Sequence, residues 1–91
     1  MNKQKRKTIW SQIKELETLS SQIEDIKSEI ENVRDEEEEA FDNLPCGIQE
    51  SERGETMQEC MNGMDDACSS IDDIISNLEE AIGRLQEVIE M

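Results

Sequence analysis

Apolar residues recur every three or four positions along almost the whole chain, and this period constrains the fold more than any other feature. Steps of three and four match the turn of an α-helix, whereas a strand would alternate at every second residue. Asn43, Pro45 and Gly47 then interrupt the first run. The pattern predicts a long helix over residues 9–43, whose apolar positions are Ile9, Ile13, Leu16, Leu19, Ile23, Ile26, Ile30, Val33, Ala40 and Phe41.

The second half of the chain repeats every seven residues and carries three apolar columns. The first column is Met57, Met64, Ile71, Leu78 and Leu85; the second is Cys60, Ala67, Ile74, Ala81 and Val88; the third is Met61, Cys68, Ile75, Ile82 and Ile89. A two-stranded coiled coil needs only two columns, so the additional column predicts contact with more than one neighbouring helix. We expect the third column to be the one that a single pair of helices leaves partly exposed.

These patterns predict an all-α protein, an antiparallel, coiled-coil-like two-helix hairpin that assembles into a helical bundle as a dimer or higher oligomer. Residues 1–8 are expected to form a basic tail and residues 9–91 the single domain, with helices over 9–43 and 55–90 and a loop over 44–54. Thr56 and Glu59 have the spacing of a capping box, and Ser51 is an earlier candidate cap. The predicted oligomer interface consists of Ile71, Ile75, Leu78, Ile82, Leu85 and Ile89.

Two glycines within the second helical pattern require an explanation. Gly63 and Gly83 each cost about 1 kcal/mol relative to alanine in a helix interior. Small residues flank them in the heptads, which favours close approach of another helix at these positions.

The composition limits the kind of partner. The chain has 91 residues, of which 34% are hydrophobic and 2% aromatic, so a monomer has little apolar surface to bury and association would supply more. Its formal net charge of −15 disfavours membrane surfaces and nucleic acid as direct partners, since both are polyanions. Basic protein surfaces are the expected partners. No long apolar run follows the basic start MNKQKRK, so a cytoplasmic location is predicted.

The sequence lacks the residue patterns that are typical of metal sites and active sites. Cys46, Cys60 and Cys68 are an odd number without CxxC spacing, and the chain has no histidine, so we predict neither a disulfide framework nor a metal site. The many carboxylates occur without a glycine-rich phosphate loop or a sheltered pocket. We therefore predict a protein without enzymatic activity and without a cofactor.

An acidic stripe is the most regular chemical feature. It consists of Glu59, Asp65, Asp66, Asp72, Asp73, Glu79, Glu80 and Glu87, which repeat every seven residues on the predicted outer face of the second helix. Such a stripe can imitate a nucleic-acid backbone and occupy the basic groove of a nuclease, helicase or repressor. The more ordinary interpretation is a solvated outer face. The candidate partner-binding residues are Asp65, Asp66, Asp72, Asp73, Glu79 and Glu80, with Ser51, Glu52 and Arg53 from the loop.

A basic and aromatic patch lies at the N-terminus, where Lys3, Lys5, Arg6 and Lys7 precede Trp10. A base could stack on the indole while the cations meet phosphates. We favour instead a disordered tail that screens the acidic body, with Trp10 against a neighbouring subunit.

The stretch DEEEEAFDNLPCGIQESERGE, residues 35–55, combines an acidic run, a proline turn and the cluster Ser51, Glu52, Arg53 and Gly54. From Val33 to the C-terminus the chain resembles a family of short, acidic, uncharacterised proteins encoded in bacteriophages and prophages of Gram-positive bacteria. That family shares the acidic run, the DNLP turn and a SERGE-like segment followed by acidic and apolar heptads. Cys46, Cys60 and Cys68 depart from it, because acidic or small residues are expected there.

The resemblance implies a helical hairpin in a phage setting and brings no established activity. Small acidic phage proteins often inhibit host defence, so an inhibitor that occupies a basic surface is the leading functional hypothesis. A structural or regulatory coiled-coil adaptor is the alternative. An oligomer that sequesters a small signalling nucleotide is a third hypothesis, which the scarcity of arginine and lysine beyond the tail disfavours.

Overall fold

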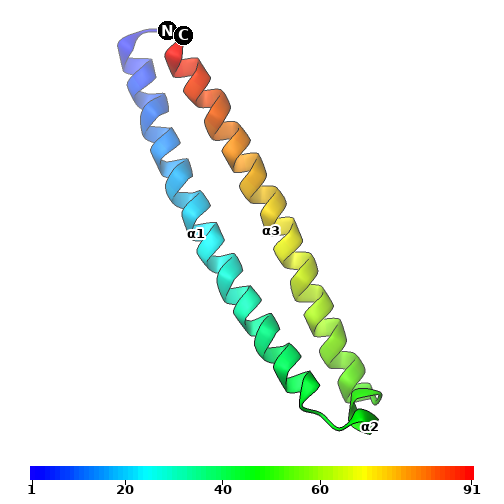
Figure 1. Cartoon of the computed structure of the whole chain (residues 1–91). Helices are drawn as coiled ribbons and strands as arrows, with labels where there is room; N and C mark the ends of the chain where they lie inside the picture. Colours follow the sequence, from blue (N-terminus) through cyan, green and yellow to red (C-terminus); the bar gives the residue numbers. More distant parts are fainter. The chain divides into compact units, whose positions relative to one another are not determined.

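The computed structural model describes residues 1–91, and all of its regular secondary structure is helical (Figure 1). It contains α1 (Lys3–Asp42), the short α2 (Cys46–Gln49) and α3 (Glu52–Glu90), and no strand. The predicted all-α class is confirmed. None of the helices combines the length and apolar character that crossing a membrane requires. The chain divides into two compact units, unit 1 (residues 1–25 and 72–91) and unit 2 (residues 26–71).

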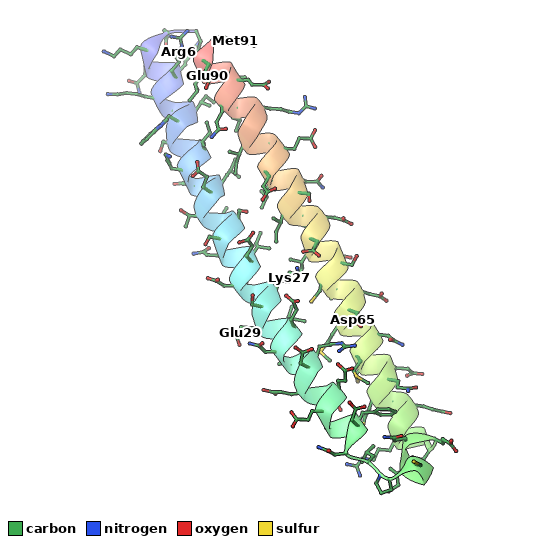
Figure 2. The ribbon with its side chains drawn as sticks, in the orientation of Figure 1. Arg6, Lys27, Glu29, Asp65, Glu90 and Met91 are labelled. Carbon is green, nitrogen blue, oxygen red and sulfur yellow. The ribbon has the colours of Figure 1, made fainter.

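Unit 1 pairs the first part of α1 with the last part of α3. Its most buried side chains are Ile13, with 2% of its surface exposed, and Ile75, with 8%. The Arg6 guanidinium donates a hydrogen bond of 2.6 Å to the carbonyl oxygen of Met91, and Figure 2 shows these two labelled residues beside each other. The pairing therefore extends to both ends of the chain.

The start of α1 differs from the prediction. Residues 3–8 are helical, so the expectation that the basic segment lies outside the first helix is wrong. The Asn2 side-chain oxygen accepts a 2.8 Å hydrogen bond from the Lys5 backbone N–H. The backbone carbonyl of Asn2 accepts a second hydrogen bond, from the Arg6 backbone N–H. Since asparagine is among the best N-cap residues, this cap starts the helix ahead of the first apolar position.

Unit 2 contains the remainder of α1, all of α2 and the start of α3. The segment predicted as a loop is largely ordered as helix. Pro45 has an extended backbone, and its carbonyl accepts hydrogen bonds from Ile48 and Gln49, which closes the single turn of α2. The Gln49 side-chain amide donates a 3.0 Å hydrogen bond to the carbonyl of Phe41, which ties α2 to the end of α1.

The start of α3 also corrects a prediction. The helix begins at Glu52, so Thr56 lies inside it and the predicted capping box with Glu59 is wrong. The Ser51 carbonyl accepts a 3.0 Å hydrogen bond from the Glu55 backbone N–H, which starts the helical ladder earlier than expected. The Ser51 hydroxyl donates to the carbonyl of Ile48, and so bonds back toward α2.

The burial of the three apolar columns differs from the prediction. In the third column Met61 and Ile75 are buried and the other three residues half-buried, so this column is the best covered of the three, and the expectation that it is the one left partly exposed is wrong. In the second column Cys60, Ala67 and Ile74 are exposed. The six predicted interface residues, Ile71, Ile75, Leu78, Ile82, Leu85 and Ile89, are all buried or half-buried within the single chain. Periodicity identifies the columns, but it does not tell which column faces the chain's own partner helix.

Gly63 and Gly83 are not sites of close packing within the chain. A Cβ atom added to either glycine would meet nothing within 4 Å, so the prediction of close helix approach is wrong for the single chain. Gly54 shows the opposite environment. A Cβ atom there would lie 2.0 Å from the carbonyl oxygen of Gln49, so the absence of a side chain lets α3 start directly against α2.

Candidate binding surfaces

The six acidic candidates of the stripe all lie on α3 with exposed side chains. Asp65 and Asp66 belong to unit 2, and Asp72, Asp73, Glu79 and Glu80 to unit 1. Residues seven apart on a helix, such as Asp73 and Glu80 within unit 1, are separated by about 10.5 Å along the axis. The stripe therefore presents carboxylates to solvent at regular intervals, as a charged partner would require.

One stripe residue is already engaged in an ion pair between the two long helices. Asp65 Oδ1 lies 3.0 Å from Nε of Arg34 on α1. Arg34 also lies 3.6 Å from Asp35 and donates a hydrogen bond to Glu38. Burial acts to lower the pKa of Arg34, but the attraction of Asp65 and the contacts with Glu38 outweigh this and raise the pKa. Arg34 therefore stays positively charged. Its ion pair with Asp65 stabilises unit 2, so Asp65 is already engaged within the chain.

Replacing Arg34 by methionine is expected to lower the melting temperature by several degrees. The change leaves Asp35, Glu38 and Asp65 close together without the cation that now neutralises them. Circular dichroism during heating measures the effect. Arg84→Met is the matched control, because Arg84 is well exposed and pairs only with Glu80 one turn earlier on α3. Equal melting of the two variants would show that the Arg34 cluster contributes nothing particular.

The predicted loop candidates lie at the start of α3. Glu52 and Arg53 are exposed, whereas Ser51 is half-buried and its hydroxyl is used in the hydrogen bond to Ile48. All three belong to unit 2. Glu52 and Arg53 are therefore the two loop candidates whose side chains face solvent.

The basic patch is part of α1 in unit 1. Lys3, Lys5 and Lys7 are exposed, while Arg6 is half-buried against the end of α3. Trp10 is exposed, and Nζ of Lys14 lies 5.3 Å from the centre of its ring, within the range of a cation–π contact. The cations and the indole therefore sit on an ordered helix, where one of them is already used to hold α3.

An apolar groove in unit 2 is a surface that the sequence patterns did not reveal. It has a volume of about 670 Å³ and is lined by Glu29, Ile30, Val33 and Glu37 of α1 and by Cys60, Gly63, Met64 and Ala67 of α3. Figure 2 labels Glu29, on the α1 side of this groove. In the sequence, the groove corresponds to the small residues Cys60 and Ala67 of the second column, next to Gly63. These residues predict a groove only when the second column is known to be exposed.

The cysteine side chains carry free thiols. Cys46 and Cys60 are exposed and Cys68 is half-buried. No three or more cysteine and carboxylate side chains come together in the arrangement that would hold a metal ion.

Comparisons of this chain with protein-family models, with curated proteins and with solved structures found no match.

Proposed function

We propose that this protein is a non-catalytic acidic binding protein that occupies a basic surface of another protein through the stripe on α3. The observation that carries the proposal is the exposure of all six acidic candidates, on a helix that contains no basic residue between Arg53 and Arg84. In the phage setting that the sequence resembles, the fitting target is a host defence or nucleic-acid-handling protein, because its groove is built to receive regularly spaced anions.

The recognition is electrostatic and repetitive. Within each unit, carboxylates about 10.5 Å apart along α3 can each meet a lysine or arginine of the partner's groove. Arg84 already neutralises Glu80, at 2.9 Å, and Asp65 neutralises Arg34. Asp66, Asp73 and Glu79 are therefore the stripe residues that we assign to the partner.

We infer that α1 and α3 form an antiparallel helical hairpin that displays this stripe. In unit 1 the support is the Arg6 hydrogen bond to Met91, which joins the start of α1 to the end of α3. In unit 2 it is the ion pair of Arg34 with Asp65, together with α2, which connects the two helices. Each of these contacts supports an antiparallel pairing of the two helices within its unit.

A structural or regulatory adaptor is the second candidate function. The observation that favours it is the set of large apolar side chains left exposed on the single chain, including Leu19, Ile26 and Val33 on α1 and Ile74 on α3. Adaptor binding would rest on these apolar anchors, so it would resist salt, whereas binding by the stripe would not.

The triple variant Asp66→Lys, Asp73→Lys and Glu79→Lys is expected to abolish binding of the partner while leaving helicity unchanged. All three residues are exposed, and the variant spares Asp65, whose loss would disturb unit 2. The parent chain, immobilised, captures host proteins at low salt for identification by mass spectrometry. Binding of the purified partner is then measured for each variant, and should weaken steeply from low to physiological salt.

The matched control reverses three acidic residues of α1, Glu24→Lys, Asp25→Lys and Glu39→Lys, which changes the net charge by the same amount. These residues are also exposed. The control is expected to retain most of the affinity. If the stripe variant binds as tightly as the parent, the stripe is not the binding surface, and attention moves to Glu52 and Arg53.

A further inference from the structure

The single chain exposes more surface than a chain of its mass normally does. Its accessible surface is 6660 Å², whereas a compact folded monomer of 10.5 kDa exposes about 5400 Å². The excess, roughly 1200 Å², exceeds the approximately 800 Å² that each partner buries in a standard protein interface. Only Ile13, Met61 and Ile75 are buried apolar side chains. Large apolar side chains that remain exposed, among them Ile26, Val33 and Ile74, are available to another chain.

Unit 2 carries a ridge and a groove on neighbouring helices. The ridge consists of Ile26 and Val33 on α1, which are 56% and 52% exposed and seven residues apart. The floor of the groove on α3 runs from Cys60 through Gly63 to Ala67, over the same seven-residue distance. Because Val33 also lines the groove, the ridge and the groove border each other. A large-residue ridge beside a small-residue groove of equal length is the arrangement that a self-complementary surface requires.

We propose that unit 2 pairs with unit 2 of a second copy, so that the Ile26–Val33 ridge of each chain packs into the Cys60–Gly63–Ala67 groove of the other. A two-fold interface requires one patch to be complementary to itself, and the ridge and the groove supply the two halves of such a patch. The proposal goes beyond the proposed function and does not depend on the acidic stripe.

The pairing gives a reason for the glycine at position 63, whereas the contacts within the single chain give none. Gly63 lies in the interior of α3, where glycine is unfavourable, and no atom of its own chain comes within 4 Å of the position of a Cβ atom. In the pair, the valine of the partner's ridge approaches the backbone at this point. A larger residue at position 63 would fill the space that the partner's ridge occupies, while leaving the fold of the single chain intact.

The charge of unit 2 predicts a salt dependence for the dimer that differs from the salt dependence of binding by the stripe. Unit 2 contains 14 acidic and 3 basic residues, a net charge of −11, and Glu29 and Glu37 border the groove. Two such surfaces repel each other, so salt should strengthen the pair by screening the repulsion. Binding of a basic partner by the stripe should respond to salt in the opposite direction.

Sedimentation velocity across a range of micromolar concentrations, at low and high sodium chloride, tests the proposal on the full chain. The parent is expected to form dimers, and more of them at high salt. Gly63→Leu is expected to weaken dimerisation at least about tenfold with unchanged helicity. Gly83→Leu is the matched control, since it places the same side chain in open space on the same helix but outside the groove.

The double variant Ile26→Ser and Val33→Ser provides the second arm, because both side chains are exposed in the single chain and their loss should spare its fold. It is expected to weaken dimerisation as Gly63→Leu does. A parent that stays monomeric at high salt would overturn the proposal and leave the groove to a different protein. Dimers that survive both variants, or that Gly83→Leu disrupts equally, would show that the copies associate through another face.

Discussion

Replacing Ile75 by aspartate should abolish cooperative unfolding of the chain. Ile75 is only 8% exposed and belongs to the small apolar core of unit 1. Burying a carboxylate without a partner costs several kcal/mol, and the whole stability of a small domain is on the order of 5–15 kcal/mol. Since the chain has three buried apolar side chains in all, little else can compensate. Circular dichroism during thermal and urea unfolding measures the loss.

The neighbouring residue supplies the control. Ile74 is 47% exposed, so Ile74→Asp introduces the same side chain one position away, in contact with water. We expect this variant to keep the parent's helicity and to change its unfolding free energy by less than about 1 kcal/mol, because the carboxylate remains solvated. If Ile75→Asp and Ile74→Asp melt alike, the assignment of the third column to the core of the single chain is wrong.

Comparison of the two neighbours shows what periodicity predicts and where it stops. The seven-residue repeat correctly separates the apolar columns from the acidic stripe, because polar and apolar positions differ in chemistry. Ile74 and Ile75 have the same chemistry, so no pattern of types distinguishes them. Their burial depends on how α3 is rotated about its axis against α1, and this rotation is decided by the packing of both helices together.

The helix boundaries were missed for a related reason. Asn2, which was not predicted as a cap, accepts hydrogen bonds from Lys5 and Arg6 and starts α1 ahead of the first apolar position. α3 begins next to Ser51, the earlier of the two candidate caps, whose carbonyl accepts a hydrogen bond from Glu55. Thr56 and Glu59 have the spacing of a capping box, but they do not cap α3, because the helix begins four residues before Thr56, at Glu52. Local polar contacts at a terminus are worth about 1 kcal/mol each, so several alternative starts compete closely.

The candidate site was predictable in its residues but not in their partners. The exposure of Asp66, Asp73 and Glu79 agrees with the expected outer face of the second helix. The engagement of Asp65 by Arg34 joins residues 31 positions apart, and no spacing rule within one helix reveals such a pair. The apolar groove is similarly formed from two helices at once.

Gly54 lies at the start of α3, directly against the end of α2. Gly54→Ala is expected to destabilise the chain by about 2–3 kcal/mol, the cost of forcing an overpacked position to rearrange. An added Cβ atom would lie 2.0 Å from the carbonyl oxygen of Gln49 and 2.5 Å from its carbonyl carbon. These are backbone atoms, so relief requires α2 to move away from α3. The Gln49 hydrogen bond to Phe41, which ties α2 to α1, would be strained as well.

Gly83→Ala should instead raise the free energy of unfolding. Gly83 lies in the interior of α3 with nothing within 4 Å of an added Cβ atom, so alanine there gains about 1 kcal/mol of helix propensity without a clash. Urea unfolding monitored by circular dichroism gives both free energies under one set of conditions. A Gly54→Ala variant as stable as the parent would mean that α2 does not hold its position against the start of α3. The segment 51–55 would then act as a linker, because no contact between α2 and α3 would require a glycine at position 54.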